Sequence, residues 1–308
     1  MPNPVLTTPT YAGEFAGKYI SAALLSASTL DKGLITIMPN VKYKSVLQTA
    51  SYNDIVADST CDFTASGTLT LAEKIIEPEE FQVNVQLCKK DLHASWEAEQ
   101  MGYSAFDNLA PSFEEYVIAY TAAKVAAKVE SNIWSGQTGN AGEFDGFYYL
   151  AAADAGVVDV TGTTVDASNV ITEMGKVADA IPTAVYGQED TFIYVASNVA
   201  RAYIRALGGF GANGLGANGV NSAGPTWFSN GALSFDGIPV VVAQGMPNHS
   251  MIAAQKSNLF FGTGLLNDTN EVQVIDMAPL DGSRNVRVVM RFTAAVAIGI
   301  STDVVLYA

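Results

Sequence analysis

The side chains that most often perform chemistry in proteins are scarce in this sequence. Its only histidines are His93 and His249, and its only cysteines are Cys61 and Cys88. A histidine-based zinc site or a serine-histidine-aspartate triad would need one of these histidines, and neither lies in an HExxH or near a GxSxG pattern. Two cysteines are too few for a disulfide framework, so we expect reduced thiols, although the sequence leaves their pairing open.

A glycine-rich stretch at residues 208–224 contains the motif closest to a ligand site. GFGANG at 209–214 and GLGANG at 214–219 both match the GxGxxG pattern of dinucleotide-binding loops. That pattern binds a pyrophosphate only where it follows a strand and begins a helix. Here it follows a predicted helix that ends near Leu207, and the glycine and proline content prevents a helix from beginning inside it. We interpret the stretch as a flexible loop that becomes ordered where several copies of the chain meet.

The charged side chains also fail to form a catalytic constellation. The candidate groups are Glu79-Glu80, Glu97 and Glu99 among the acids, and Lys89-Lys90, Arg284, Arg287 and Arg291 among the bases. Nothing places the acids in a pocket, and the bases are too sparse for a nucleic-acid patch. Over the whole chain, 16 Lys and Arg oppose 31 Asp and Glu, a net charge of −15, which disfavours binding of nucleic-acid phosphates. We therefore predict no catalytic residue, no metal and no cofactor.

The overall composition indicates a surface covered by partners. Hydrophobic residues make up 49% of the 308 residues and charged residues 15%, whereas an ordinary soluble domain has roughly 25% charged residues. Because solvated surface is usually rich in charge, this balance is typical of a subunit in an assembly. We find no apolar run of about 18 residues and no basic, apolar N-terminus, so we expect neither a membrane span nor a signal peptide.

The first third of the chain predicts an arm, a long hairpin and a strand. Residues 1–33 are small and polar, with one short apolar patch. Strand-like alternation at 34–47 and again at Leu69 and Leu71 encloses a polar middle, which predicts a long hairpin. Such a hairpin buries little against its own chain and should lie on something else. Residues 81–87 alternate as a half-buried strand.

A helix at about 113–135 is the clearest single element. Ser112 and Glu115 form an S-x-x-E capping box, and Gly136 suits the position after the last turn. Its apolar residues form two stripes: Phe113, Tyr116, Tyr120, Ala123, Ala127 and Trp134, and beside them Ile118, Ala122, Val125, Val129 and Ile133. Stripes this wide predict that more than one side of the helix is covered.

The rest of the chain alternates between helices and strands. We predict helices at 169–181 and from Ser197 to about Leu207, and strands at 191–196, 238–243, 251–254, 258–261, 272–275 and 286–307, the last unusually long. This order indicates a mixed α+β fold with two regions, one built on the long helix and one on α/β units.

The order of these elements resembles the Hong Kong 97-type major capsid protein of tailed bacteriophages. The local similarity lies in VESNIWSG (129–136) with EFDGF (143–147), in FDGIPVV (235–241) with MP (246–247) and NLFFG (258–262), and in NVRVVMRF (285–292) onward to Tyr307. The resemblance implies an N-terminal arm at 1–38 and an extended β-hairpin loop at 39–76. It implies a peripheral domain at 77–149 and 268–294 with a spine helix at 112–135, and an α/β axial domain at 150–267 and 295–308.

What the resemblance implies for function is a shell rather than an enzyme. Copies would assemble into hexamers and pentamers of an icosahedral head that encloses double-stranded DNA without sequence-specific binding. The chain would be made in the host bacterial cytoplasm and reside in the virion, away from any membrane. Its short arm implies a separate scaffolding protein, with a portal and, left open, a decoration protein as further partners. Some relatives form Lys–Asn crosslinks, but Lys42, Lys44 and Lys74 match no evident partner.

Two alternatives stay open at this point. The first is an encapsulin-like nanocompartment shell, which shares the fold and stores a protein cargo. The second is an acidic enzyme that binds a nucleotide at the glycine loop.

Overall fold

The structure is a computed structural model that describes residues 28–41, 43–53, 55–56, 58–59, 61, 67–88, 111–207, 233–264 and 272–308. For residues 52–53, 111–117 and 272–274 it describes the backbone alone. Several predicted features lie outside the described residues: most of the arm, the glycine stretch 208–224, and Lys42, Lys89, Lys90, His93, Glu97 and Glu99.

The first sheet is organised around one long strand. Its members are β1 (Thr36–Pro39), β4 (Glu79–Cys88), β10 (Leu259–Thr263), β11 (Val272–Asp276) and β12 (Asn285–Ile298). Strand β12 pairs antiparallel with β4 over its first ten residues, with β11 on its other side, and with β10 near its end. Strand β1 runs parallel to β10. The period-two pattern of β4 predicted its half-buried state, because alternate side chains face opposite sides of a sheet.

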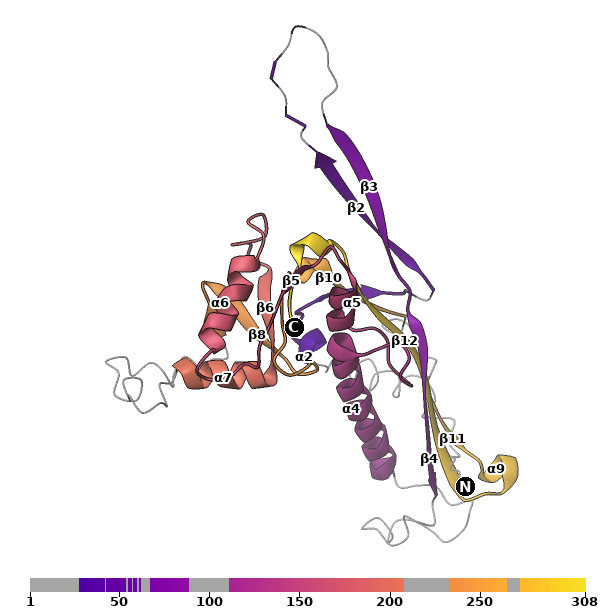
Figure 1. Cartoon of the computed structure of the whole chain (residues 1–308). Coiled ribbons are helices and arrows are strands. Elements are labelled where there is room, and N and C mark those ends of the chain that lie inside the picture. Colours follow the sequence, from indigo (N-terminus) through magenta and orange to yellow (C-terminus); the bar gives the residue numbers. More distant parts are fainter. Residues whose placement is uncertain are drawn as a thin grey trace.

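The second sheet belongs to the α/β region. Its six strands are β5 (Val158–Val160), β6 (Thr191–Ala196), β7 (Leu233–Phe235), β8 (Ile238–Ala243), β9 (Met251–Gln255) and β13 (Val305–Tyr307), in the order β5-β13-β9-β6-β8-β7. Helices α6 (Val170–Ala180) and α7 (Ser197–Leu207) lie beside this sheet (Figure 1). The α+β class is confirmed.

One predicted strand is wrong in its extent. The segment 286–307 is two strands, because β12 ends at Ile298 and the chain turns through Gly299 and the short 3₁₀ helix η5 (Ser301–Asp303). An added Cβ at Gly299 would lie 2.8 Å from the side-chain oxygen of Asn258, which accepts the Ile300 N–H, so a larger residue would disturb this turn. The turn passes the chain from the first sheet to the second, where β13 pairs with β5 and β9.

The long helix α4 (Pro111–Ser135) is confirmed, but its predicted cap is displaced. Pro111 already lies in the helix, so Ser112 is a helical residue rather than the cap. Proline suits the first turn because it has no N–H that would need a partner there. Smaller helices are α2 (Ser28–Asp31), α5 (Phe147–Ala153) and α9 (Ala278–Asp281), and neither α5 nor α9 was predicted from the sequence.

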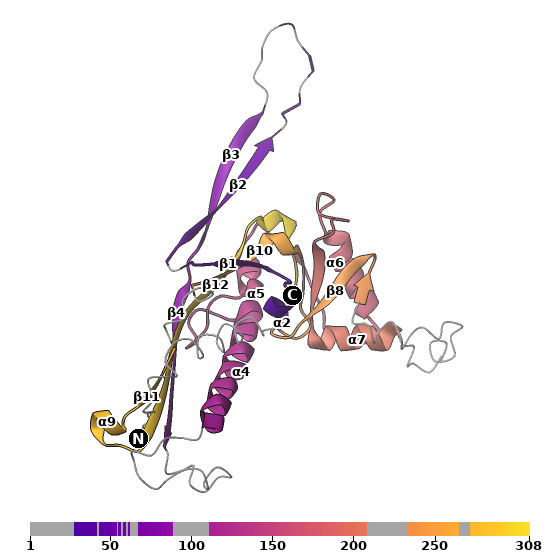
Figure 2. The same ribbon diagram turned by 180° about the vertical axis from the view of Figure 1, so that it is seen from behind.

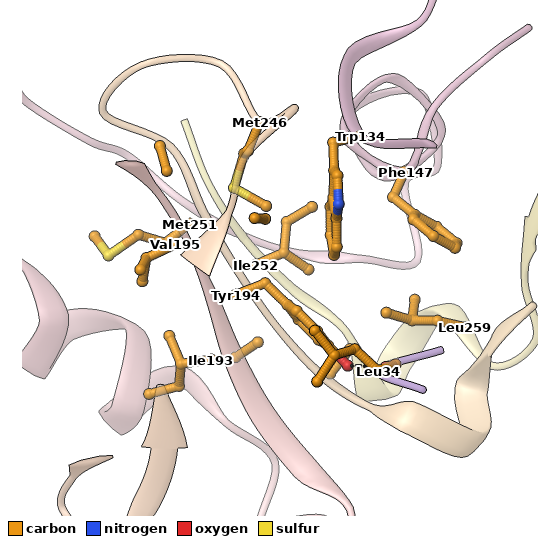
Figure 3. Packing of buried hydrophobic residues seen from close by; sticks show 14 of the residues in the cluster. Leu34, Trp134, Phe147, Ile193, Tyr194, Val195, Met246, Met251, Ile252 and Leu259 are labelled. Carbon is orange, nitrogen blue, oxygen red and sulfur yellow. Dashed lines mark hydrogen bonds between the residues drawn. The ribbon is translucent and has the colours of Figure 1, made fainter. Parts of the chain in front are cut away.

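The C-terminal end of α4 lies against the second sheet. The indole of Trp134 lies between two other rings, with centroids 5.0 Å from that of Tyr194 on β6 and 5.5 Å from that of Phe147 on α5 (Figure 3). The Tyr194 hydroxyl donates to the carbonyl oxygen of Leu34 at 2.6 Å. Burial raises the pKa of Tyr194, so this hydroxyl stays a donor. These contacts join the arm, the long helix and the second sheet in one core.

Candidate assembly surfaces

The predicted extended hairpin is present and points away from the rest of the molecule. Strands β2 (Ser45–Asn53) and β3 (Thr68–Ile76) form a two-stranded antiparallel sheet that pairs with no other described strand. In both views the hairpin projects beyond the two larger sheets (Figures 1 and 2). A two-stranded hairpin is marginally stable by itself in water, so this geometry is unusual unless another surface supports it.

One face of the hairpin is mostly apolar and is uncovered within the chain. The directly opposed pairs on this face are Val46–Ile75, Gln48–Glu73 and Ala50–Leu71, and Leu69 follows Leu71. The polar Gln48–Glu73 pair therefore separates two apolar patches. The side chain of Leu71 is 72% exposed and that of Ile75 is 57% exposed. A strip of this kind on a projecting element is typical of a surface that packs against a partner.

The opposite face holds the base of the hairpin to the body. Ile76 is 1% exposed and packs with Val41, Ala295 and Ala297. Two residues along the strand, Lys74 donates to Asp154 at 2.6 Å. Three donors, from Lys74, Ser301 and the backbone of Gly156, lower the pKa of Asp154 to about 2.

The chain covers one apolar stripe of the long helix α4 along its described length and the other stripe only at its C-terminal end. Of its two apolar stripes, Ile118, Ala122, Val125, Val129 and Ile133 are buried. On the other stripe Trp134 is buried, whereas Tyr120, Ala123 and Ala127 are exposed. Within the chain, the predicted cover on more than one side is therefore limited to the C-terminal end of the helix. Tyr120 is 53% exposed and has the Lys124 amine 5.4 Å from its ring centroid. The exposed part of the second stripe, at Ala123 and Ala127, suits packing against another molecule.

Two grooves flank α4. The first, of about 520 Å³, is lined by Ser28, the alanines at 123, 126 and 127, Glu130, Ser131, Gln244 and Gly245. The second, of about 350 Å³, lies between α4 and β4 and is mostly apolar, with Phe81, Val83 and Val85 on one wall and Tyr120 and Val125 on the other. Both are open to solvent, and neither contains a group of acids and bases arranged for catalysis.

Three glycines let loops approach the last turns of α4. An added Cβ would lie 2.3 Å from the Phe144 carbonyl oxygen at Gly136, 2.5 Å from that of Asn132 at Gly146, and 2.3 Å from that of Glu130 at Gly245. None of the three has a positive φ angle, so close approach requires glycine here rather than a left-handed turn. This corrects the reason given for Gly136, although the helix ends where we predicted.

Glu130 fastens α2 to this end of the helix. Its buried carboxylate accepts from Ser28 Oγ at 3.0 Å, from Thr29 N at 3.0 Å and from Thr29 Oγ1 at 2.6 Å. The Trp134 indole donates to Thr29 Oγ1 at 2.8 Å. No local pattern in the sequence predicts this role of Glu130, because its partners lie about a hundred residues away in the chain.

The remaining chemistry-bearing residues have structural partners or stand apart. His249, in a left-handed conformation (φ 67°), accepts the Val165 N–H at its Nδ1 atom and lies 2.9 Å from the Asn198 amide. Cys61 and Cys88 are free thiols, Cys61 exposed and Cys88 half-buried. Glu79 accepts from Thr138, and Glu80 is exposed.

Within the described residues, no three His, Cys, Asp or Glu side chains are grouped to hold a metal ion. No helix among them is both long and apolar enough to span a membrane. Of the lysines considered for crosslinking, Lys44 pairs with Glu77 at 2.8 Å, which raises its pKa, and Lys74 pairs with Asp154.

Comparison with known proteins identifies the fold. No protein-family model and no curated protein matches the sequence. Among solved structures, the capsid of a native GTA particle aligns with a TM-score of 0.60 at 16% identity, over 98% of this chain and 93% of that chain. A satellite phage P4 procapsid that includes size determination (Sid) protein aligns with a TM-score of 0.56 at 10% identity, over 94% of this chain and 97% of that chain. A virus-like particle from Pyrococcus furiosus aligns with a TM-score of 0.52 at 9% identity, over 96% of this chain and 99% of that chain. At these identities the likeness shows the fold, and the predicted Hong Kong 97-like capsid fold is confirmed.

Proposed function

We propose that this chain, with its Hong Kong 97-like fold, is the major capsid protein of a tailed phage. Its copies form the hexamers and pentamers of an icosahedral head around double-stranded DNA, and the chain catalyses no reaction. The observation that carries this proposal is the projecting hairpin, whose apolar face is uncovered within the chain. A neighbouring copy in a shell would cover it.

The composition and the uncovered stripe of α4 support the same proposal. A subunit with 15% charged residues and an exposed apolar helix face suits packing on several sides. The net charge of −15 disfavours tight binding of the enclosed DNA by repulsion.

We assign the parts of the chain as the resemblance implies: an arm to residue 38, the loop 39–76, the peripheral domain 77–149 with 268–294, and the axial domain 150–267 with 295–308. A scaffolding protein, a portal and a decoration protein are the proposed partners, and the virion is the proposed location after synthesis in the host cytoplasm.

Truncation of the hairpin tests the proposal. Because Leu47 pairs directly with Lys74, replacing residues 48–73 by Asn-Gly joins them through a two-residue turn and keeps Ile76 and Lys74 at the base. We expect a soluble chain with cooperative unfolding that sediments as monomers or small rings, under conditions in which the parent forms shells. Closed particles of parental size from the truncated chain would contradict the proposed role of the hairpin.

A second candidate is an encapsulin-like shell that stores a protein. The observation that favours it is the similarity to a virus-like particle at a TM-score of 0.52. Particles purified from the native source separate the two: packaged double-stranded DNA supports the phage head, whereas nucleic-acid-free shells with one co-purifying protein support the compartment. A chain that stays monomeric and binds a nucleotide saturably would instead support the enzyme.

A further inference from the structure

Three segments from distant parts of the chain meet at one carboxylate below the hairpin. Asp154, just after α5, accepts from Lys74 of β3 at 2.6 Å, from the Ser301 hydroxyl at 2.6 Å and from the Gly156 amide at 3.0 Å. Lys74 also donates to Ser301 at 3.1 Å, so the three side chains close a triangle. Ser301 lies in the turn that passes the chain from the first sheet to the second.

The space around this triangle is closely fitted. An added Cβ at Gly156 would lie 3.1 Å from the Ser301 Cβ and 3.2 Å from Asp154 Oδ1. Asp154 has its side chain 29% exposed and Lys74 42% exposed. The junction is thus partly open to water, so the ion pair adds little to the free energy of unfolding. Such a contact suits a role in fixing the direction of the hairpin.

The geometry gives the hairpin two points of attachment. The first point is an apolar cluster, in which Ile76 is buried and against which Leu47 on β2 packs, and it acts as a pivot. The second is Lys74, the next residue after Ile76 on the same face of β3. Adjacent residues on one face of a strand are about 6.6 Å apart. A single point of contact leaves the hairpin free to swing, whereas a second point at this distance fixes its direction.

We propose that Asp154 is a positioning residue that sets the direction of the hairpin through Lys74 and couples it to the turn between the two sheets. In the shell of the proposed function, on which this inference rests, the same contact selects the angle between neighbouring copies and hence the size of the closed particle.

The direct test measures the hairpin on the unassembled chain. Spin labels at Ser51→Cys on β2 and Ile171→Cys on α6, with Cys61 and Cys88 replaced by serine, report the distance from hairpin to body by pulsed electron resonance. Both labelled positions are exposed. We expect one narrow peak in the distance distribution of the parent. In Asp154→Asn and Lys74→Met we expect a broad distribution instead.

A matched control and a charge reversal separate positioning from general damage. Lys44→Met removes the same charge at the hairpin base, but its partner Glu77 belongs to the hairpin's own base, so the narrow peak should persist. The double reversal Lys74→Asp with Asp154→Lys should restore it. A narrow peak at the parental distance in Asp154→Asn would overturn the inference.

Particle size is the second readout. In Asp154→Asn we expect shells of mixed diameter by electron microscopy, against one diameter for the parent and for Lys44→Met. Uniform parental shells from a variant whose hairpin has loosened would overturn the coupling to size. A parent chain that forms neither shells nor hexameric or pentameric rings would overturn the proposed function, while the distance measurement would still decide the role of Asp154.

Discussion

At the scale of single residues, the buried carboxylate of Glu130 has the largest predicted effect on folding. Glu130→Ala would leave the Thr29 amide and two hydroxyls without their acceptor, and Thr29 is only 1% exposed. Because unsatisfied buried donors are costly, we expect the free energy of unfolding to fall by about 2–3 kcal/mol. Chemical denaturation of the unassembled chain, followed by tryptophan fluorescence, measures this loss.

Glu143→Ala is the control for Glu130. Glu143 also accepts from several donors, Lys128, Asn140 and the Gln137 amide, but at the surface. We expect a loss of about 0.5 kcal/mol there. If Glu130→Ala and Glu143→Ala lower the free energy of unfolding equally, the link between α2 and α4 stabilises the chain no more than a surface contact does.

The ionisation of Asp154 predicts a dependence of stability on pH. Its pKa is lowered from 3.8 to about 2, chiefly by the hydrogen bond from Lys74, so the folded chain favours the charged form. That contribution is fully present above pH 3.8 and is lost as the pH falls through about 2. Since the pair is partly exposed, we expect it to contribute about 1 kcal/mol.

Denaturation of parent and Asp154→Asn between pH 5 and about 2 measures this contribution. The difference between the two proteins should be largest at the upper end and much smaller at the lower end. A difference that stays constant over this range would mean that the carboxylate charge is not the source of the stabilisation.

At the scale of elements, glycines decide how closely loops approach α4. Gly245→Ala would place a Cβ 2.3 Å from the Glu130 carbonyl oxygen, a backbone atom that cannot move aside without shifting the helix. We expect a loss of about 1–3 kcal/mol in the free energy of unfolding.

Gly175→Ala on α6 is the control, because nothing lies within 4 Å of the added Cβ. There alanine should stabilise the chain by about 0.5–1 kcal/mol, since glycine is a poor helix former. Thermal or chemical denaturation measures both changes. If the free energy of unfolding changes in the same direction in Gly245→Ala and Gly175→Ala, this explanation is contradicted.

The elements also show what hydrophobic periodicity can and cannot predict. Strands β6 and β8 were predicted at their observed bounds, because short apolar runs between turn residues are distinctive. Helix α5 was missed, since seven residues hold too few turns to show a helical period. The exposure of Ala127 was missed for another reason. A stripe of apolar residues records that a face is covered, but not whether the cover comes from the same chain.

Contacts between residues far apart in the chain could not be predicted from the sequence for a similar reason. The hairpin followed from local alternation, whereas the Lys74–Asp154 pair joins residues 80 positions apart with no local pattern around either one. The same holds for Glu130 and Thr29. Local patterns therefore predicted the elements that form the candidate surfaces, and only the folded chain shows how those elements are attached.

At the scale of the whole molecule, a shell multiplies the effect of one apolar contact. Leu71 is 72% exposed, so Leu71→Ser should leave the unfolding of the single chain unchanged. If a neighbour buries this side chain, its loss removes about 2 kcal/mol per contact, or roughly 30-fold in association between two copies. Because every subunit makes the contact, the concentration at which shells appear should rise at least that much.

Thr70→Ser is the matched control for Leu71→Ser. Thr70 neighbours Leu71 on the same strand but points to the opposite face of the hairpin, and it too is exposed. Static light scattering against protein concentration compares the thresholds of the three chains. We expect the Thr70→Ser threshold to match the parent. A parental threshold in Leu71→Ser, with the chain folded, would mean that the apolar face of the hairpin stays in water in the shell. The direction of the hairpin would then have to be fixed by its base alone, through Ile76 and Asp154, rather than by a neighbour that covers its length.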